Sequence, residues 1–599
     1  MLTLLLSAAA FGQSSAQELP PACSPASQAL TVSTANELAA LVQRTNCSQG
    51  EFVVSWEGEL TFSEPIVVGN STAVLISGVG TGAVLDGGGS SRLFQVSGGA
   101  ALHLENLELR NGSAPEFSLG GGAIYADGDE LTLLATSCNF TSNSSPVDGG
   151  AISSRGAVSM EFIDCRFEDN SAEQHGGAVM ADSALAVIAS NSLFVGNVAN
   201  GSSFEGKGGA IYLSGGTPEL SLHTCELRSN RASFNGGAVY SNASGSITVN
   251  ATWLEANWAG YWGGGICVTG EMAQVDVLDS LFTDNFVNDI VNWDRYWLNL
   301  HGGGAVYVFG PAGIALKSSN FSGNGAESGG AAMFYGNNNI TVEGSLFAEN
   351  LANNNGGGVS VLNGGGFDAI FTDTVFLENW SGGNGGGLYS LGSTGSVNLT
   401  RTNFSNNAAA YRDGFPNNPG SYRGGGYWTS GDAGMESRAV ACLFEGNEAD
   451  AQGGAVAIDG GTFNATACNF SGNVGGSGGA IAASRDYEGQ SAATVAVRGG
   501  FLSRNTAEVW YGYQGSYGYG GALFAEEGAE ATLDVVTLDG NLGGSGAVSV
   551  SAGSLVSASG ADFSANVAEI CGGAVQAWGN GSRFVSEGAR LPATLPKDR

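Results

Sequence analysis

Aromatic and charged side chains that could bind a ligand gather in a few segments of this 599-residue chain. They are Trp262, Trp293, Asp294, Arg295, Tyr296, Trp297, Tyr411, Arg412, Tyr422, Trp510 and Tyr511. Flat rings beside charged groups suit a sugar, which has an apolar face and a rim of hydroxyl groups. We expect these segments to contact a polysaccharide, a cell-surface glycan or another surface protein. The alternative is that the rings fold back and shield the backbone of the molecule.

A second candidate set is charged. Asp127, Arg155 and Asp182 each stand six residues after the first glycine of a recurring Gly-Gly pair. A carboxylate, a guanidinium and a second carboxylate in a row could bind an acidic sugar or supply acid and base groups. A ladder of alternating charges, which avoids stacking like charges, is the structural interpretation, and we favour it.

The pattern gives little support for catalysis or for a cofactor. The repeats contain no adjacent pair of aspartates, and Lys207 and Lys317 are the only lysines before the C-terminal tail. His175 and His301 are too far apart in the repeat order to act together. No Cys-x-x-Cys pair or His-bearing metal spacing occurs. We therefore expect no metal and no cofactor, and we lean away from an enzyme.

Two short phrases that alternate along the chain show which elements must position these residues. Gly-Gly-Ala-(Ile/Val/Leu), with its variants, occurs in sixteen copies, and (Phe/Leu)-x-x-Asn occurs in fifteen. Most copies of each phrase lie 25 to 29 residues apart. A period of this size indicates a solenoid in which each repeat is one coil stacked on the next.

The repeat from Gly149 to Asn170 shows how one coil is built. Apolar residues alternate within short pieces, as Val158, Met160 and Phe162 do, which is the strand period of two. The alternation shifts between pieces, so a corner separates them. We predict three short strands per coil, paired in parallel with the coils above and below. Stacking then produces apolar columns inside and a ladder of asparagines at one corner.

Longer intervals between copies place insertions at one shared corner, between the asparagine and the next Gly-Gly pair. The inserted segments are 199–207, 286–301, 408–423 and 506–519, and they contain most of the aromatic candidates. We therefore expect the aromatic side chains to form a row along one side of the rod.

Composition restricts the class of partner. The formal net charge is −34 with only three lysines, so nucleic acid is an improbable ligand. Residues 1–16 read as a secretory signal with an apolar stretch and a Ser-Ser-Ala cleavage site. Sixteen Asn-x-Ser/Thr sequons fit a secreted glycoprotein. No later segment reaches 18 uninterrupted apolar residues, so we predict no transmembrane segment and an extracellular or cell-surface location.

Nine cysteines leave at least one unpaired in a monomer. Cys23 and Cys47 precede the repeats and are the candidates for a disulfide that closes an N-terminal cap. Cysteines at equivalent positions, Cys138 with Cys165 and Cys442 with Cys468, should stack on neighbouring coils. A disulfide fits that spacing, and buried free thiols fit it equally well.

The paired phrases resemble the repeats of chlamydial polymorphic outer-membrane proteins over about 120–580. The coil as a whole resembles a right-handed parallel β-helix of the pectin-lyase-like group, whose opening coils are similar to 85–112. The first resemblance implies a surface-displayed adhesin. The second implies that loops entering one strand column can build a polysaccharide cleft. It also implies a lysine or arginine base with carboxylates, or a tight group of aspartates, in members that are enzymes.

Together these patterns predict an all-β protein, a right-handed parallel β-helix of about 16–18 coils. The expected layout is a signal peptide at 1–16, a cap and first strands at 17–84, the β-helix at 85–580 and a tail at 581–599. The expected role is structural and adhesin-like recognition of a glycan or protein through the aromatic corner. The alternative is a polysaccharide-active lyase, hydrolase or epimerase, and a fragment of a larger surface protein is a third possibility.

Overall fold

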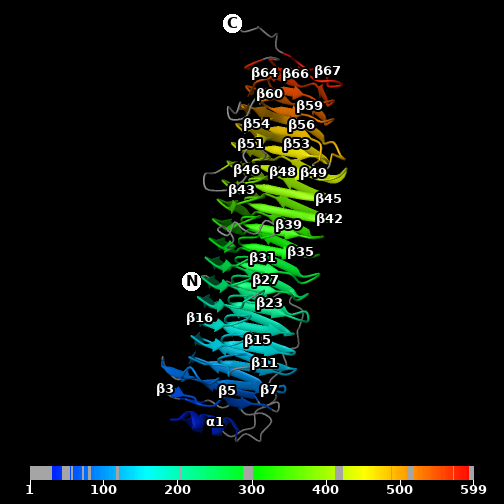
Figure 1. Ribbon diagram of the computed structural model, residues 1–599. Helices are drawn as coiled ribbons and strands as arrows, with labels where there is room; N and C mark the ends of the chain where they lie inside the picture. Colours follow the sequence, from blue (N-terminus) through cyan, green and yellow to red (C-terminus); the bar gives the residue numbers. More distant parts are fainter. Residues whose placement is uncertain are drawn as a thin grey trace, which may run out of the picture.

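The computed structural model describes residues 30–43, 54–55, 58–69, 73–78, 82–115, 120–202, 204–287, 301–411, 422–486, 489–508, 518–570 and 573–591. Over these residues the chain winds into one long rod of about 17 coils (Figure 1). Every pairing between its strands is parallel apart from one isolated bridge in the loop at Arg485. The predicted parallel β-helix is thereby confirmed.

Most coils have one strand more than the alternation predicted. In the coil that begins at Gly149, β14 (Ile152–Arg155), β15 (Val158–Ile163) and β16 (Arg166–Glu168) are the three predicted strands. A fourth strand of two residues, β17 (Ser171–Ala172), follows the asparagine. A two-residue strand shows no alternation of its own and forms because its backbone pairs with the next coil at Val198–Ala199.

The first strands of the coils form one continuous face, which we call the first-strand sheet. Its members are β4 (Ile66–Val68), β7 (Phe94–Ser97), β10 (Ile124–Asp127), β14, β18 (Val179–Asp182), β22 (Ile211–Ser214), β26 (Val239–Ser241), β30 (Ile266–Val268), β34 (Val306–Phe309), β38 (Ala332–Tyr335), β42 (Val359–Thr372), β45 (Leu388–Thr400), β48 (Tyr427–Ser430), β52 (Val456–Asp459), β55 (Ile481–Ser484), β58 (Leu523–Ala525), β62 (Val548–Val550) and β66 (Val575–Ala577). β42 and β45 continue through the following corner into the second strand of their coils.

The short fourth strands form a separate sheet of 15 strands. They run from β13 (Ser144–Ser145) to β65 (Val567–Ala568) and include β21 (Val198–Ala199), β33 (Phe286–Val287), β47 (Ala408–Ala409) and β57 (Thr506–Ala507). The four predicted insertions begin within these last four strands, so all four start at one shared corner.

The glycines of the Gly-Gly pair allow the coils to approach at this corner. Gly149 has φ +61°, a conformation that residues with a Cβ rarely adopt. A Cβ on the following Gly150 would lie 2.1 Å from the carbonyl oxygen of Gly177 in the next coil. The alanine that follows, Ala151, points into the core and is fully buried. The repeated phrase is thus a turn, a close backbone contact and a core residue in that order.

The interior consists of stacked apolar columns, as the repeats predict. Phe140, Phe167 and Phe194 stack with ring centroids 4.6 and 4.7 Å apart and nearly parallel planes. The spacing matches the distance between paired strands, so one ring per coil fills the column without a gap.

The predicted asparagine ladder is present from Asn143 to Asn566 and is buried along nearly its whole length. Asn324 is representative of the ladder. Its Nδ2 donates to Oδ1 of Asn350 at 3.0 Å and to the carbonyl of Phe282 at 3.0 Å. Its Oδ1 accepts from the backbone N–H and Nδ2 of Asn285, both at 3.0 Å. Each amide therefore satisfies buried polar groups on both neighbouring coils.

The two ends of the rod differ. The helix α1 (Ala35–Gln43) covers the N-terminal end, where Leu38 and Val42 are buried against the first coils. At the C-terminal end, β66 and β67 (Arg583–Glu587) keep most of their side chains exposed. Stacked strands run from β3 (Gly58–Thr61), within the predicted cap and first strands, to β67 near the C-terminal end.

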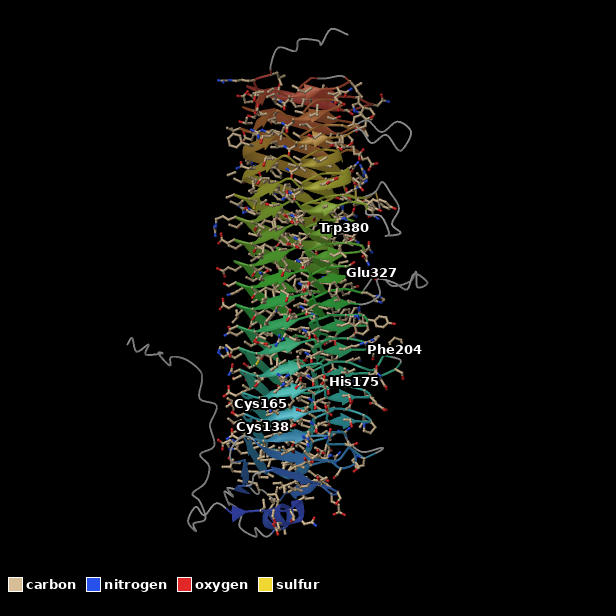
Figure 2. All side chains as sticks on the ribbon, turned by 90° about the vertical axis from the view of Figure 1, so that its left-hand side faces the viewer. Cys138, Cys165, His175, Phe204, Glu327 and Trp380 are labelled. Atoms are coloured by element: carbon tan, nitrogen blue, oxygen red, sulfur yellow. The ribbon has the colours of Figure 1, made fainter. Side chains whose placement is uncertain are left out.

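The cysteines that the structure describes are buried free thiols. They are Cys138, Cys165, Cys225, Cys267, Cys442 and Cys468. Figure 2 shows Cys138 and Cys165 on adjacent coils, as the repeat positions predict. The proposed pair Cys23 and Cys47 lies outside the described residues.

Candidate ligand-binding groove

Two columns of side chains occupy the outer surface of the first-strand sheet. The outer column contains the second residue of each first strand, which points away from the core. Its aromatic members are Tyr125, Tyr212, Tyr240, Tyr307, Tyr389, Trp428 and Phe524. Although they point outward, these side chains are almost fully buried.

The pre-glycine column explains that burial. It contains the residue just before each Gly-Gly pair. The carbonyl of that residue accepts a hydrogen bond from the backbone N–H of the first glycine of the preceding coil, as the Lys207 carbonyl does from Gly176 at 3.0 Å. Side chains of this column reach sideways over the outer column. His175 stacks on Tyr212 with centroids 4.5 Å apart, and Trp262 stacks on Tyr307 at 5.2 Å.

In the N-terminal half of the rod these two columns fill the surface. Nζ of Lys207 lies 5.2 Å from the ring centroid of Tyr240, a cation–π contact. Burial, together with the nearby Lys207 charge, lowers the pKa of His175 to about 4. Burial also raises the pKa of Asp148, whose Oδ1 accepts the His175 backbone N–H at 3.1 Å. The pre-glycine side chains therefore cover the outer column in this half of the rod.

In the C-terminal half the same surface is open. A groove of about 890 Å³ lies along the outer side of β38, β42, β45, β48 and β52, and we call it the outer groove. Its lining residues are Tyr335, Leu362, Asn363, Asn384, Tyr389, Leu391, Gly392, Ser393, Arg423, Trp428, Ser430, Gly431, Asp432, Asp459, Arg485, Asp486 and Glu527. Tyr389 and Trp428 stack on each other at 4.5 Å, and both line the floor of the groove.

A buried network around Asp459 organises one side of the groove. Asp459 is only 7% exposed, and its Oδ1 accepts from Nη1 of Arg423 at 2.7 Å and from the Ser484 hydroxyl at 2.6 Å. Its Oδ2 accepts from Nε1 of Trp428 at 2.9 Å. A buried carboxylate needs such partners because loss of its hydration is otherwise costly. Asp459 thereby fixes the orientation of both Arg423 and the Trp428 ring.

A second carboxyl group lies behind this network. Oε1 of Glu526 accepts from Nε2 of Gln452 at 2.6 Å. Burial raises the pKa of Glu526, and Arg423 acts in the opposite direction. Asp459 is thus paired with an arginine, whereas burial raises the pKa of the neighbouring Glu526 carboxyl group.

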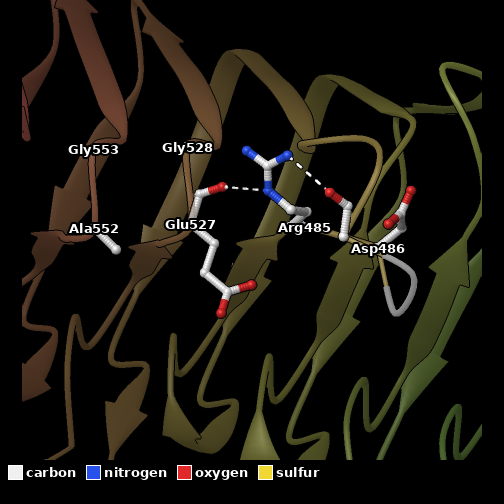
Figure 3. Close-up of a pocket in the computed structure, with 7 residues that line it drawn as sticks. Arg485, Asp486, Glu527, Gly528, Ala552 and Gly553 are labelled. Atoms are coloured by element: carbon white, nitrogen blue, oxygen red, sulfur yellow. Dashed lines mark hydrogen bonds between the residues drawn. The ribbon is translucent and has the colours of Figure 1, made fainter.

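The groove continues toward the C-terminal end into a shallower hollow of about 720 Å³. Figure 3 shows Arg485 at its edge, where Nε donates to the carbonyl of Glu527 at 3.2 Å and Nη1 donates to that of Gly489 at 3.1 Å. Arg485, Asp486 and Glu527 line both spaces, so the two form one open path along the rod.

Three of the predicted aromatic binding residues are described by the structure. Trp262 is half-buried on Tyr307, and Tyr422 is 3% exposed between Ala409 and Ala449. Tyr411 is 43% exposed, and its backbone N–H donates to Asp450 at 2.6 Å. Two of the three rings therefore pack against the rod. The other candidates, Trp293, Asp294, Arg295, Tyr296, Trp297, Arg412, Trp510 and Tyr511, lie outside the described residues.

The shared corner does carry exposed aromatic side chains that the prediction did not name. Phe204, labelled in Figure 2, is 72% exposed on the 199–207 insertion. Its ring meets that of Phe234 edge-on, with centroids 5.2 Å apart. Phe234 in turn contacts Tyr261 at 4.6 Å.

The predicted charged column is in register. Asp127 pairs with Arg155, and Arg155 pairs with Asp182, on three successive first strands. No ion pair within 4.0 Å joins these three side chains. Asp127 instead accepts from the Tyr125 hydroxyl at 3.1 Å, and Asp182 accepts from the Ser214 hydroxyl at 3.2 Å. The side chains alternate in sign along the column without forming close pairs.

Sequence reasoning named Asp127 but missed Asp459, which occupies the same position in its own coil. Asp459 also stands six residues after the first glycine, Gly453, and the strand pairing continues the column through Ser430 and Ser484. The offset alone could have identified Asp459. Its partners could not have been found this way, because Trp428 and Arg423 come from the preceding coil and Ser484 from the following one.

The fold and groove define a right-handed parallel β-helix protein with an open channel on one face. Residues 92–282 match a family described as a right handed beta helix region. A search of curated proteins gave no match. Within the described ranges, no helix is long and apolar enough to cross a membrane. The same residues contain no group of three His, Cys, Asp or Glu side chains placed to hold a metal ion.

Proposed function

We propose that this protein is a secreted or cell-surface β-helix that recognises a glycan chain along the outer groove. The observation that carries the proposal is the groove itself, an open path with an aromatic floor and paired polar groups on its walls. Ligand sites of this size combine apolar surface with a few fixed polar groups. A path that runs along the rod suits a linear polymer, which can occupy several coils at once.

Two further features support a recognition role. Exposed Phe204 and Tyr411 stand on the insertion corner, beside the first-strand sheet that bears the groove. The likeness of the two repeated phrases to chlamydial polymorphic outer-membrane proteins favours an adhesin-like role. Extracellular location and glycosylation belong to the same proposal and rest on residues 1–16 and the sequons.

The test is retention of the purified protein on immobilised polysaccharides. We expect Tyr335→Ala with Leu391→Ala to weaken binding by about tenfold, since each removes apolar surface from the groove wall and tenfold corresponds to about 1.4 kcal/mol. Phe501→Ala with Val535→Ala is the matched control, because both side chains are exposed away from the groove. Equal retention of the two double variants would refute the groove as the binding site.

A polysaccharide-active enzyme is the second candidate, favoured by one specific observation. Asp459 is paired with Arg423, whereas burial raises the pKa of Glu526 nearby. Neighbouring carboxyl groups whose environments differ are typical of acid–base pairs. The assay is the appearance of reducing or unsaturated chain ends after incubation with each retained polysaccharide. Glu526→Gln should abolish any such activity while leaving retention intact.

A further inference from the structure

The charges that line the outer groove indicate which glycans it can accept. Two arginines and four carboxylates face the groove, and the whole chain carries a formal charge of −34. They are Arg423, Arg485, Asp432, Asp459, Asp486 and Glu527. A polymer of uronic acids would enter a negative field here, and a polymer that carries positive charge would be attracted.

Both arginines are already engaged. Arg423 bonds to Asp459 at 2.7 Å and to the Ser484 hydroxyl at 3.3 Å. Arg485 donates to two backbone carbonyls, those of Glu527 and Gly489. A ligand carboxylate would have to displace these contacts, so neither guanidinium is a ready site for an acidic sugar.

The carboxylates divide into two kinds. Asp459 is held by its network, and the carboxylate of Asp486 accepts the backbone N–H groups of Gln490 and Ser491, each at 2.7 Å. The side chains of Asp432 and Glu527 are exposed. Among the described residues, no hydrogen bond or ion pair engages either carboxylate. These two groups are the ones that can accept hydrogen bonds from a ligand.

We infer that the outer groove binds a glycan of amino sugars whose amines are free and protonated, through Asp432 and Glu527. The inference rests on the proposed function and names its ligand class. An ammonium group supplies both the charge and the donors that an exposed carboxylate lacks here. Asp432 and Glu527 lie three coils apart, about 14 Å at 4.8 Å per coil, so a chain of several sugars can reach both.

The experiment compares three hexasaccharides in titration calorimetry at pH 5.5 and low salt. They are hexamers of glucosamine, N-acetylglucosamine and galacturonic acid, the last without calcium. We expect the glucosamine hexamer to bind about tenfold more tightly than its acetylated form, and the galacturonate hexamer not to bind. Added salt should remove most of the difference in affinity between the glucosamine and acetylated hexamers, because it screens exposed charges.

Matched variants locate the effect in the groove. Asp432→Asn with Glu527→Gln should bring the affinity for the glucosamine hexamer down to that for the acetylated hexamer. Glu161→Gln with Glu530→Gln removes two exposed carboxylates from second strands and should leave the preference unchanged. A preference that survives the groove variant would assign the effect to overall charge and overturn the inference.

Two further outcomes separate this inference from the proposed function. Equal binding of the glucosamine and acetylated hexamers, or preferred binding of the galacturonate hexamer, would overturn the inference and leave glycan recognition standing. Binding of no hexamer would overturn both. A lysine hexamer is the last probe. If it binds as tightly as the glucosamine hexamer and with the same dependence on Asp432 and Glu527, the groove recognises basic peptide and the assignment to amino sugars fails.

Discussion

At the scale of single residues, the rod keeps its buried charges by pairing or by neutralising them. The buried carboxylate of Asp459 accepts hydrogen bonds from three donors, which satisfy its oxygens. His175 has no such counter-charge and lies beside the Lys207 cation, so burial favours its neutral form. The same surface therefore contains a carboxylate held by three donors at the open groove and an imidazole whose pKa is lowered by burial at the filled half.

The His175 environment predicts a pH dependence of stability. Its pKa is about 4 in the folded protein and 6.5 in an unperturbed chain. Between these values the unfolded chain binds a proton that the folded protein does not, so stability should fall as the pH falls from 6.5 to 4. His175→Phe preserves a ring to stack on Tyr212 and should reduce this loss, as measured by urea unfolding at several pH values. Titration of the His175 imidazole at or above pH 6.5, followed by NMR, would contradict the prediction.

At the scale of elements, the groove opens where the coil changes shape. β42 and β45 continue through the corner between first and second strands, and their register shifts between Asn363 and Gly366. Leu362, Leu391 and Asp432 lie at this corner and form one wall. The pre-glycine column, with Asn384 and Arg423, forms the other wall. The groove thus forms where the two corners that flank the regular first-strand sheet change in shape.

The Gly-Gly turn gives a prediction with a matched control close by in the sequence. Gly472 and Gly478 have φ +63° and +61°. A Cβ on Gly472 would meet nothing within 4 Å, whereas one on Gly478 would lie 2.3 Å from the carbonyl oxygen of Ile481. Gly472→Ala should cost about 1–2 kcal/mol of backbone strain. Gly478→Ala should cost about 1–3 kcal/mol more from the added steric conflict.

Thermal and denaturant unfolding of the two alanine variants provide the measurement. If Gly478→Ala were no less stable than Gly472→Ala, the close approach within the turn would not be what requires glycine there.

The regular parts of this fold were predictable because each repeat has the same types of residue at the same spacing. The glycine turn, the stacked phenylalanines and the asparagine ladder all follow from residues such as Gly149, Phe167 and Asn170 at fixed spacing. The groove was not predictable in the same way. Trp428, Asp459 and Ser484 meet only because three coils stack in register, and each looks unremarkable within its own repeat. The burial of Tyr422 likewise depends on Ala449 in the neighbouring coil.

At the scale of the whole molecule, stability should vary along the rod. Nearly all strand pairings of a coil are with its immediate neighbours, so local opening needs the loss of few interfaces and begins most easily at an uncovered end. α1 covers the N-terminal end with Leu38, but the side chains of β67 remain mostly exposed. The central strand β38 is buried at three of its four positions.

We therefore predict a gradient of amide hydrogen exchange. Amides of β66 and β67 should exchange at least about a hundredfold faster than those of β38, since a hundredfold corresponds to about 2.7 kcal/mol of opening free energy. Leu38→Asp should accelerate exchange in β4, which contacts α1, and in its partner strand β7, and leave β38 unchanged, because the lost contacts are confined to the N-terminal end. Mass spectrometry of proteolytic fragments after timed exchange measures both effects. Uniform exchange along the rod, or acceleration of β38 by Leu38→Asp, would mean that the coils unfold as one cooperative unit rather than from their ends.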